Sequence, residues 1–245
     1  MRKFLLLALC FSSASFAGVS LTCSSTLGEC SASVMVPASA VPYSYNFNLP
    51  KFNTDWGTLT GITLSTQATG TGEVSVANVL PSAQTFTNAT SSAPLSISGP
   101  GGVHLNLTAT ASVAAGSIPA AQVIWGTPMG SSTPGYFPVP GFFLQNGLPL
   151  TGSNSITINS SNFGAYEGAG FSTATFTANA GRGIYQGTSV PGVFFGGDVD
   201  AGGEVTITYD LIPSDVYPAP EPGFGLLGGG LLGLTFLVRR VRARA

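Results

Sequence analysis

The chain has 245 residues, of which only 7% are charged, whereas an ordinary soluble domain has about 25%. Residues 18–219 contain nine acidic and two basic side chains, a formal net charge of −7. A nucleic-acid-binding surface is excluded, because neutralising phosphates requires clustered Lys and Arg. We expect the surface to be covered by Ser, Thr, Asn, Gln and Gly instead.

The N-terminus has the pattern of a secretory signal peptide. Arg2 and Lys3 precede an apolar stretch at residues 4–11, and Ser15 and Ala17 are small residues at the two positions where signal peptidase requires them. The sequence predicts cleavage between Ala17 and Gly18, so that residues 1–17 are removed. The apolar stretch is too short to be a membrane span.

Two cysteines, Cys23 and Cys30, stay in the exported chain. An even pair in an oxidising compartment predicts a disulfide. A metal site is the alternative, but it would need more ligands of the same kind nearby. Closing so short a loop should stabilise the fold by about 2–3 kcal/mol.

The body, residues 18–213, has the pattern of a single exported domain built from β-strands. Apolar and polar residues alternate over residues 43–49, 103–113 and 204–211, which predicts strands with one buried and one wet face. No helical period occurs in it. We predict an antiparallel β-sandwich of jelly-roll-like topology. The further expected strands are residues 59–65, 73–79, 95–98, 122–125, 155–159 and 171–178.

Residues 127–152 are rich in Gly and Pro, and we expect a long structured excursion between strands there. Phe142 and Phe143 allow two interpretations. They form an exposed tip that binds a partner, or both rings fill the core of the sandwich.

Three carboxylates fall within seven residues, at Asp198, Asp200 and Glu204, with glycines between them. We expect an acidic hairpin turn leading into the strand that starts at Glu204. Two alternatives are a Ca²⁺ site, because carboxylate oxygens suit that ion, and a pair of glycosidase acids. No other cofactor is expected.

The C-terminus has the composition of a membrane segment with a cationic end. Residues 223–238 carry no charge and span roughly 24 Å as a helix, against a hydrocarbon core of about 30 Å. Residues 214–222 form a linker before this transmembrane helix. A tail at 239–245 follows, which we expect to be cytoplasmic. The arginines that stop transfer through the membrane are Arg239, Arg240, Arg242 and Arg244.

Pro220, Glu221 and Pro222, the glycine- and leucine-rich apolar segment and the terminal arginines together resemble the PEP-CTERM sorting signal of Gram-negative bacteria. The resemblance implies recognition and cleavage near Pro220–Pro222 by an exosortase, a membrane enzyme. A removable tail of this order is read and then discarded. A permanent single-span anchor is the alternative.

Three segments resemble the choice-of-anchor E domain, an exported β-rich family whose biochemical role is not established. They are residues 49–62 (LPKFNTDWGTLTGI), 165–170 (AYEGAG) and 205–209 (VTITY). Asn53 and Trp56 stand where that family has an Asp and a small aliphatic residue. The resemblance implies a secreted β-domain and no particular activity.

Few side chains are suited to catalysis. His104 is the only histidine, and it alternates with the apolar row of its strand, which places it in solvent. No Gly-x-Ser-x-Gly turn and no phosphate-binding Gly-rich loop with a following Lys occurs.

We therefore expect a non-enzymatic protein of the cell surface or extracellular matrix, associated with exopolysaccharide or biofilm. After passing through the inner membrane it would be anchored there transiently and then sorted to the periplasm, outer surface or matrix. A hydrolase acting through Asp198 and Asp200 is one alternative. A carbohydrate-binding module is the other, and it predicts an exposed row of aromatic side chains formed by Trp56, Trp125, Tyr136 and Tyr185.

Overall fold

A computed structural model describes residues 19, 21–24, 28–127, 129–130, 132–170 and 172–213. This part of the chain contains β-strands and short 3-10 helices and no α-helix, so the prediction of an all-β fold is confirmed. The strands are β1 Thr22–Ser24, β2 Glu29–Ala40, β3 Tyr43–Pro50, β4 Gly57–Asn78, β5 Gln84–Gly99, β6 Val103–Ile118, β7 Gln122–Gly126, β8 Gly135–Val139, β9 Gly141–Pro149, β10 Gly152–Thr157, β11 Thr173–Ala180, β12 Ile184–Thr188 and β13 Val193–Pro213. The 3-10 helices are η1 Thr54–Trp56, η2 Pro100–Gly102 and η3 Ser160–Ala165.

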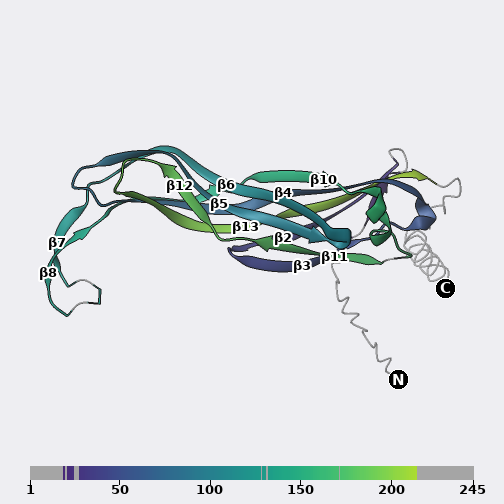
Figure 1. The fold of residues 1–245 in the computed structure, drawn as a ribbon, viewed down its shortest axis with the longest axis horizontal. Coiled ribbons are helices and arrows are strands. Elements are labelled where there is room, and N and C mark those ends of the chain that lie inside the picture. The colour runs from purple at the N-terminus through teal and green to yellow at the C-terminus, as the bar shows by residue number, and fades with distance from the viewer. Residues whose placement is uncertain are drawn as a thin grey trace, which may run out of the picture.

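The strands form two large antiparallel sheets, drawn as an elongated molecule in Figure 1. Sheet A has the order β1-β2-β13-β4-β10, and β9 follows β10 along the same edge of β4. Sheet B has the order β12-β5-β11-β3, and β6 pairs with β5 over its whole length. Strands β7 and β8 form a separate two-stranded ribbon that projects from one end of the molecule (Figure 1).

Strand pairing is nested along the chain. The strands pair β2 with β13, β3 with β11, β4 with β9 and β10, and β5 with β6. The chain therefore resembles one long hairpin with its tip at η2, in which strands before the tip pair with strands after it. The hairpin is folded over, so that its strand pairs divide between the two facing sheets. At this tip Gly101 and Gly102 have φ values of 68° and 73°, a conformation that glycine adopts without steric cost.

Several strands differ from the sequence-based expectation. Residues 59–65 and 73–79 are the two ends of one strand, β4, because β13 pairs with it without interruption through the glycine-rich middle. The segment expected as an excursion, residues 127–152, includes β8, β9 and the first residue of β10, and β9 is part of sheet A. Strands β2 and β12 were not predicted, because small and hydroxyl side chains weaken the alternation there.

Three buried clusters follow one another along β4, between the sheets. The proximal cluster is rich in large rings, including Phe47, Phe52, Tyr166, Phe176 and Tyr209. The middle cluster is mostly alanine, with Ala68, Ala93, Ala109, Ala111, Ala180 and Ala201 beside Leu95, Leu150 and Val199. The distal cluster, nearest the ribbon, is formed by Val74, Val76, Phe86, Ala89, Val113 and Ile118.

The two largest residues of the proximal cluster each have a satisfied hydroxyl. Tyr166 donates to the carbonyl oxygen of Pro100 at 2.8 Å, and Tyr209 donates to that of Pro50 at 2.9 Å. Burial raises the pKa of Tyr166 to about 12. Burial, and secondly the nearby Tyr166, raise the pKa of Tyr209 as well. Both rings therefore serve packing and stay protonated at neutral pH.

The base of the ribbon is held by one buried amide. Asn78, at the end of β4, is fully buried. Its Nδ2 donates to the carbonyl oxygens of Ser82 and Pro119, each at 2.8 Å, and its Oδ1 accepts from the backbone N–H of Leu80 at 2.9 Å. This side chain ties the strand β4 to the connection from which β7 starts.

Candidate functional site

The sorting elements predicted at both ends lie outside the described residues. This applies to the cleavage pair Ala17 and Gly18, to Pro220, Glu221 and Pro222, to residues 223–238 and to Arg239, Arg240, Arg242 and Arg244. Of the helices that the structure does describe, none is both long and apolar enough to span a bilayer. Signal-peptide removal and tail processing therefore stay predictions.

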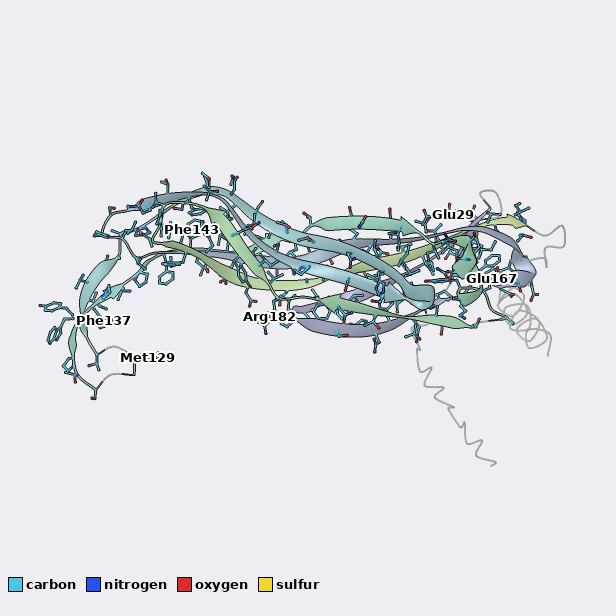
Figure 2. All side chains as sticks on the ribbon, viewed as in Figure 1. Glu29, Met129, Phe137, Phe143, Glu167 and Arg182 are labelled. Carbon is cyan, nitrogen blue, oxygen red and sulfur yellow. A yellow bond between two sulfur atoms is a disulfide. The ribbon has the colours of Figure 1, made fainter. Side chains whose placement is uncertain are left out.

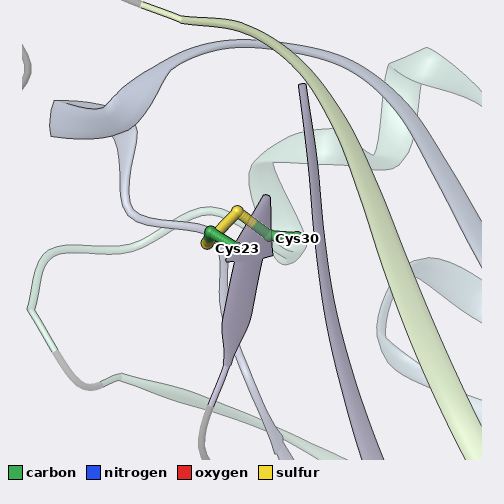
Figure 3. Close-up of a disulfide and its surroundings, with 2 residues drawn as sticks. All are labelled: Cys23 and Cys30. Carbon is green, nitrogen blue, oxygen red and sulfur yellow. A yellow bond between two sulfur atoms is a disulfide. The ribbon is translucent and has the colours of Figure 1, made fainter. Parts of the chain in front are cut away.

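The structure joins Cys23 and Cys30 in a disulfide (Figure 3). The two residues are direct partners in the β1–β2 ladder, and their Cα atoms are 4.0 Å apart. The bond links the short strand β1 to β2, and Cys30 is buried in the proximal cluster. Its place in the fold is structural, in agreement with the disulfide predicted from the sequence.

The acidic segment is not a turn, so that prediction is wrong. Asp198, Asp200 and Glu204 are all part of β13, which pairs with β4 along this whole stretch. The register against β2 shifts between Ala201 and Gly203, where β2 has one residue more, and β13 itself stays unbroken. Long-range pairing has overridden the local turn composition.

The three carboxylates divide between two places on the outer face of sheet A. Asp198 lies opposite Glu73 of β4, and with Asp200 and Asn146 they line a hollow of about 250 Å³. Glu204 lies farther along β13, opposite Gln67. Among the residues described, no group of three or more His, Cys, Asp and Glu side chains could hold a metal ion. Calcium binding by Asp198, Asp200 and Glu204 thus stays a prediction without a convergent ligand set.

Tyr185 of β12 is close enough to two of these carboxylates to be affected by their charge. Its pKa is raised by burial first and then by the carboxylates of Asp198 and Glu73. Glu73 was not selected as a site residue from the sequence, because its proximity to Asp198 depends on the pairing of β4 with β13.

A second depression, about 600 Å³ in volume, runs over β10, β4 and β13 of sheet A. Its lining offers hydroxyl and amide groups with a single carboxylate. The residues are Ser65, Thr66, Gln67, Ser153, Asn154, Ser155, Glu204 and Thr206. We call this feature the polar groove.

The side chains of the polar groove are partly held in place by neighbours. Asn154 donates to the carbonyl oxygen of Asn106 at 2.7 Å and accepts from the N–H of Ser155 at 2.9 Å. The Thr206 hydroxyl is 2.7 Å from that of Ser33. Such a surface can exchange hydrogen bonds with the hydroxyl groups of a hydrated polymer. The sequence shows the polar positions of each strand, but it does not show that β10 lies beside β4.

The aromatic row expected for a carbohydrate-binding module is not formed. Trp56 packs against the proximal cluster and contacts Phe52, and Tyr185 packs against the middle cluster. Only Trp125 and Tyr136 come together. They are direct partners on the ribbon, with ring centroids 4.9 Å apart, and they are 62% and 76% exposed.

The two phenylalanines expected to share one role are separated by strand alternation. Phe142 is 61% exposed on the outer face of β9. Phe143 packs against the distal cluster and contacts Phe86 edge to face at 4.9 Å. Phe143 therefore fills the core, as one interpretation expected of both rings, and Phe142 is exposed, while partner binding by it stays a prediction. His104 is exposed on β6, as predicted.

No family model matches the chain, and none of the curated proteins matches it. One solved structure, of infectious bursal disease virus, Gt strain, is similar at 14% identity, with a TM-score of 0.13. The match covers 87% of this chain and 50% of the viral one, so the chain spans about half the length of that protein. A likeness of this size carries no argument about fold or function. The PEP-CTERM and choice-of-anchor E resemblances thus rest on the residues quoted for them.

Proposed function

We propose that this chain is a non-enzymatic exported protein of the cell surface or extracellular matrix that associates with exopolysaccharide. The observation that carries the proposal is the polar groove, a broad shallow surface whose lining has one charge among hydroxyl and amide groups. Neutral hydrogen-bonding groups suit a hydrated sugar polymer, since they exchange hydrogen bonds with hydroxyls without first losing the hydration of an ion.

The outer face of sheet B has similar chemistry. On this sheet the hydroxyls of Thr175 and Thr177 donate to the amide oxygens of Asn48 and Asn46, each at 2.8 Å. These cross-strand pairs join β11 to β3 without ionic groups. A surface of this kind stays hydrated and carries little charge, which favours packing among polysaccharide chains.

We further propose the route by which the protein reaches the matrix. Signal peptidase removes residues 1–17, the C-terminal helix holds the chain transiently in the inner membrane, and an exosortase-type enzyme cleaves near Pro220–Pro222. The motif residues and the arginines that follow support this route, and the Cys23–Cys30 disulfide is compatible with an oxidising compartment. The nested strand pairing also supports our proposal that the sandwich is a jelly roll.

Affinity electrophoresis of the mature protein in gels containing the host's exopolysaccharide tests the association. We expect the polymer to retard the protein, and Asn154→Ala in the polar groove to weaken the retardation. Asn46→Ala is the matched control, because Asn46 is also an exposed asparagine on a strand and belongs to the opposite sheet. Unretarded migration of the unmodified protein, or equal loss in both variants, would contradict the proposal.

A further inference from the structure

The ribbon formed by β7 and β8 is the part of the described chain that the sandwich does not cover. Its five residue pairs run from Gln122 opposite Val139 to Gly126 opposite Gly135. Figure 2 shows the labelled Phe137 and Met129 well beyond the end of the sandwich. Two-stranded ribbons are marginally stable in water unless something packs on them, so the ribbon has the character of an element with a partner.

One face of the ribbon is apolar throughout. Directly opposite residues share a face of an antiparallel pair, as do residues two apart. Val123, Trp125, Tyr136 and Pro138 therefore lie on one face, and the first three are 69%, 62% and 76% exposed. Residues 74–166, which include the ribbon, contain no Asp, Glu, Lys or Arg.

The two edges of the ribbon differ. Among the described residues, no strand other than β7 and β8 belongs to this sheet. Pro138 lies on β8, and a strand tolerates proline where its nitrogen faces away from the partner. The edge of β8 therefore has one donor fewer. The β7 edge is Gln122–Gly126, which contains Val, Ile and Trp without proline or charge, and such an edge readily accepts another strand.

Pro138 also defines which groups of β7 face outward. Val123 lies opposite Pro138, and because the proline nitrogen faces outward, this pair is a non-hydrogen-bonded one. Hydrogen-bonded and non-hydrogen-bonded pairs alternate along an antiparallel ladder, so Trp125 with Tyr136, two residues farther along β7, is also a non-hydrogen-bonded pair. The N–H and C=O groups of Val123 and Trp125 therefore point away from β8, free to pair with a further strand.

The β7 edge is complementary to itself, because the outward groups of Val123 and Trp125 lie symmetrically about Ile124, so a second copy of the chain can supply that strand. The exported body has a formal net charge of −7, so an anionic lipid surface or an acidic polymer would repel it, and the ribbon has no cation to offset this. Two copies that meet ribbon to ribbon bring together uncharged segments. Their acidic residues, such as Asp198 and Glu204 of β13, stay away from the contact.

We propose that two copies of this chain associate through β7, which pairs antiparallel with the same strand of the other copy about a two-fold axis at Ile124. Val123 of each copy then exchanges hydrogen bonds with Trp125 of the other, and the two ribbons become one four-stranded sheet. The contact is self-complementary, as a two-fold interface requires, and it uses strand addition at an open edge. Asn78 holds the base of each ribbon in position for it. The proposal is independent of any association with polysaccharide.

A cysteine at the axis tests this arrangement. Ile124 of one copy would face Ile124 of the other as a non-hydrogen-bonded pair with Cα atoms about 4.5 Å apart, within the range of about 4.4–6.8 Å that a disulfide requires. We expect the Ile124→Cys protein, exported by its host, to run mostly as a dimer without reductant and as a monomer with it. Ile184→Cys is the control, because Ile184 is a strand isoleucine of similar exposure, 48% against 41%. Equal cross-linking of the two variants would overturn the proposal.

A second variant tests the pairing itself. Val123→Pro removes an outward N–H from β7, and in the Ile124→Cys chain it should abolish the dimer band while β4 and β13 stay intact. Sedimentation of the unmodified mature protein should give about twice the monomer mass at high concentration. A monomer at every concentration overturns the proposal. The proposal is also overturned if Trp125→Ala weakens binding to cello-oligosaccharides or to phosphatidylcholine vesicles and leaves dimer formation unchanged. That result would assign the apolar face to sugar or lipid.

Discussion

The sandwich and the ribbon are built from the same kinds of strand residue, but they differ in what covers them. In the proximal cluster, Phe176 is 1% exposed and stacks on Phe47 with ring centroids 5.6 Å apart. On the ribbon, Trp125 contacts one ring, Tyr136, and is 62% exposed. Apolar composition alone does not make a core; a second layer does. Side chains of the sandwich should therefore control stability, and those of the ribbon should control association.

The largest effect is expected from Phe176→Ala. Removing a fully buried aromatic ring leaves a cavity and should lower the free energy of unfolding by about 3–5 kcal/mol. Urea denaturation of the mature protein measures it. Trp125→Ala removes a larger ring from the ribbon and should change the free energy of unfolding by less than about 0.5 kcal/mol in the monomer. Similar losses in both variants would remove the distinction between the two regions.

Asn78→Ala tests the junction between the regions. The substitution removes the two hydrogen bonds that the amide donates to the carbonyl oxygens of Ser82 and Pro119 and the one that it accepts from the N–H of Leu80. A hydrogen bond contributes about 1 kcal/mol, and we expect a loss of about 2–3 kcal/mol in urea denaturation. Hydrogen exchange should increase in the connections at residues 79–83 and 119–121 ahead of the proximal strands. Uniform exchange across the chain would argue against a local role.

Phe142 and Phe143 allow a covered and an uncovered aromatic ring to be compared at adjacent positions of one strand. Phe143→Ala removes the ring packed on Phe86 and should cost about 2 kcal/mol, less than a fully buried ring because Phe143 is partly exposed. Phe142→Ala should fall within about 0.5 kcal/mol of the unmodified protein. Both values come from the same denaturation experiment. A reversed order would mean that β9 is shifted by one residue against β4.

The smallest effect is expected from Tyr166→Phe, at about 1 kcal/mol near neutral pH, because Pro100 loses its hydrogen bond. The pKa of Tyr166 is raised from 10.0 to about 12 in the folded state, so the unfolded chain loses this proton first. The stability that this group contributes is complete below pH 10 and is lost as the pH rises from about 10 to 12. Tyr166→Phe should make this decline shallower in urea denaturation repeated between pH 9 and 12, and an unchanged slope would contradict the role given to this hydroxyl.

Alternation of apolar and polar residues was sufficient to predict β3, β6 and the C-terminal half of β13, since one face of each is buried. Alternation did not predict strand in the middle of β4 or at Asp198–Glu204 of β13. The core there is mostly alanine, and the pairing of β4 with β13 keeps both segments extended. The cysteine pair was predicted from compartment and spacing. Glu73 beside Asp198 and the polar groove could not be predicted, because both depend on which strands become neighbours.

The most direct test of the account is the intact mass of the mature protein, purified from its host with and without the exosortase-type enzyme. We predict an N-terminus at Gly18 and a C-terminus near Pro220 that requires the enzyme, and any added mass would identify the attached group. A C-terminus at Ala245 in both strains would contradict the sorting proposal and make the chain a permanently anchored membrane protein.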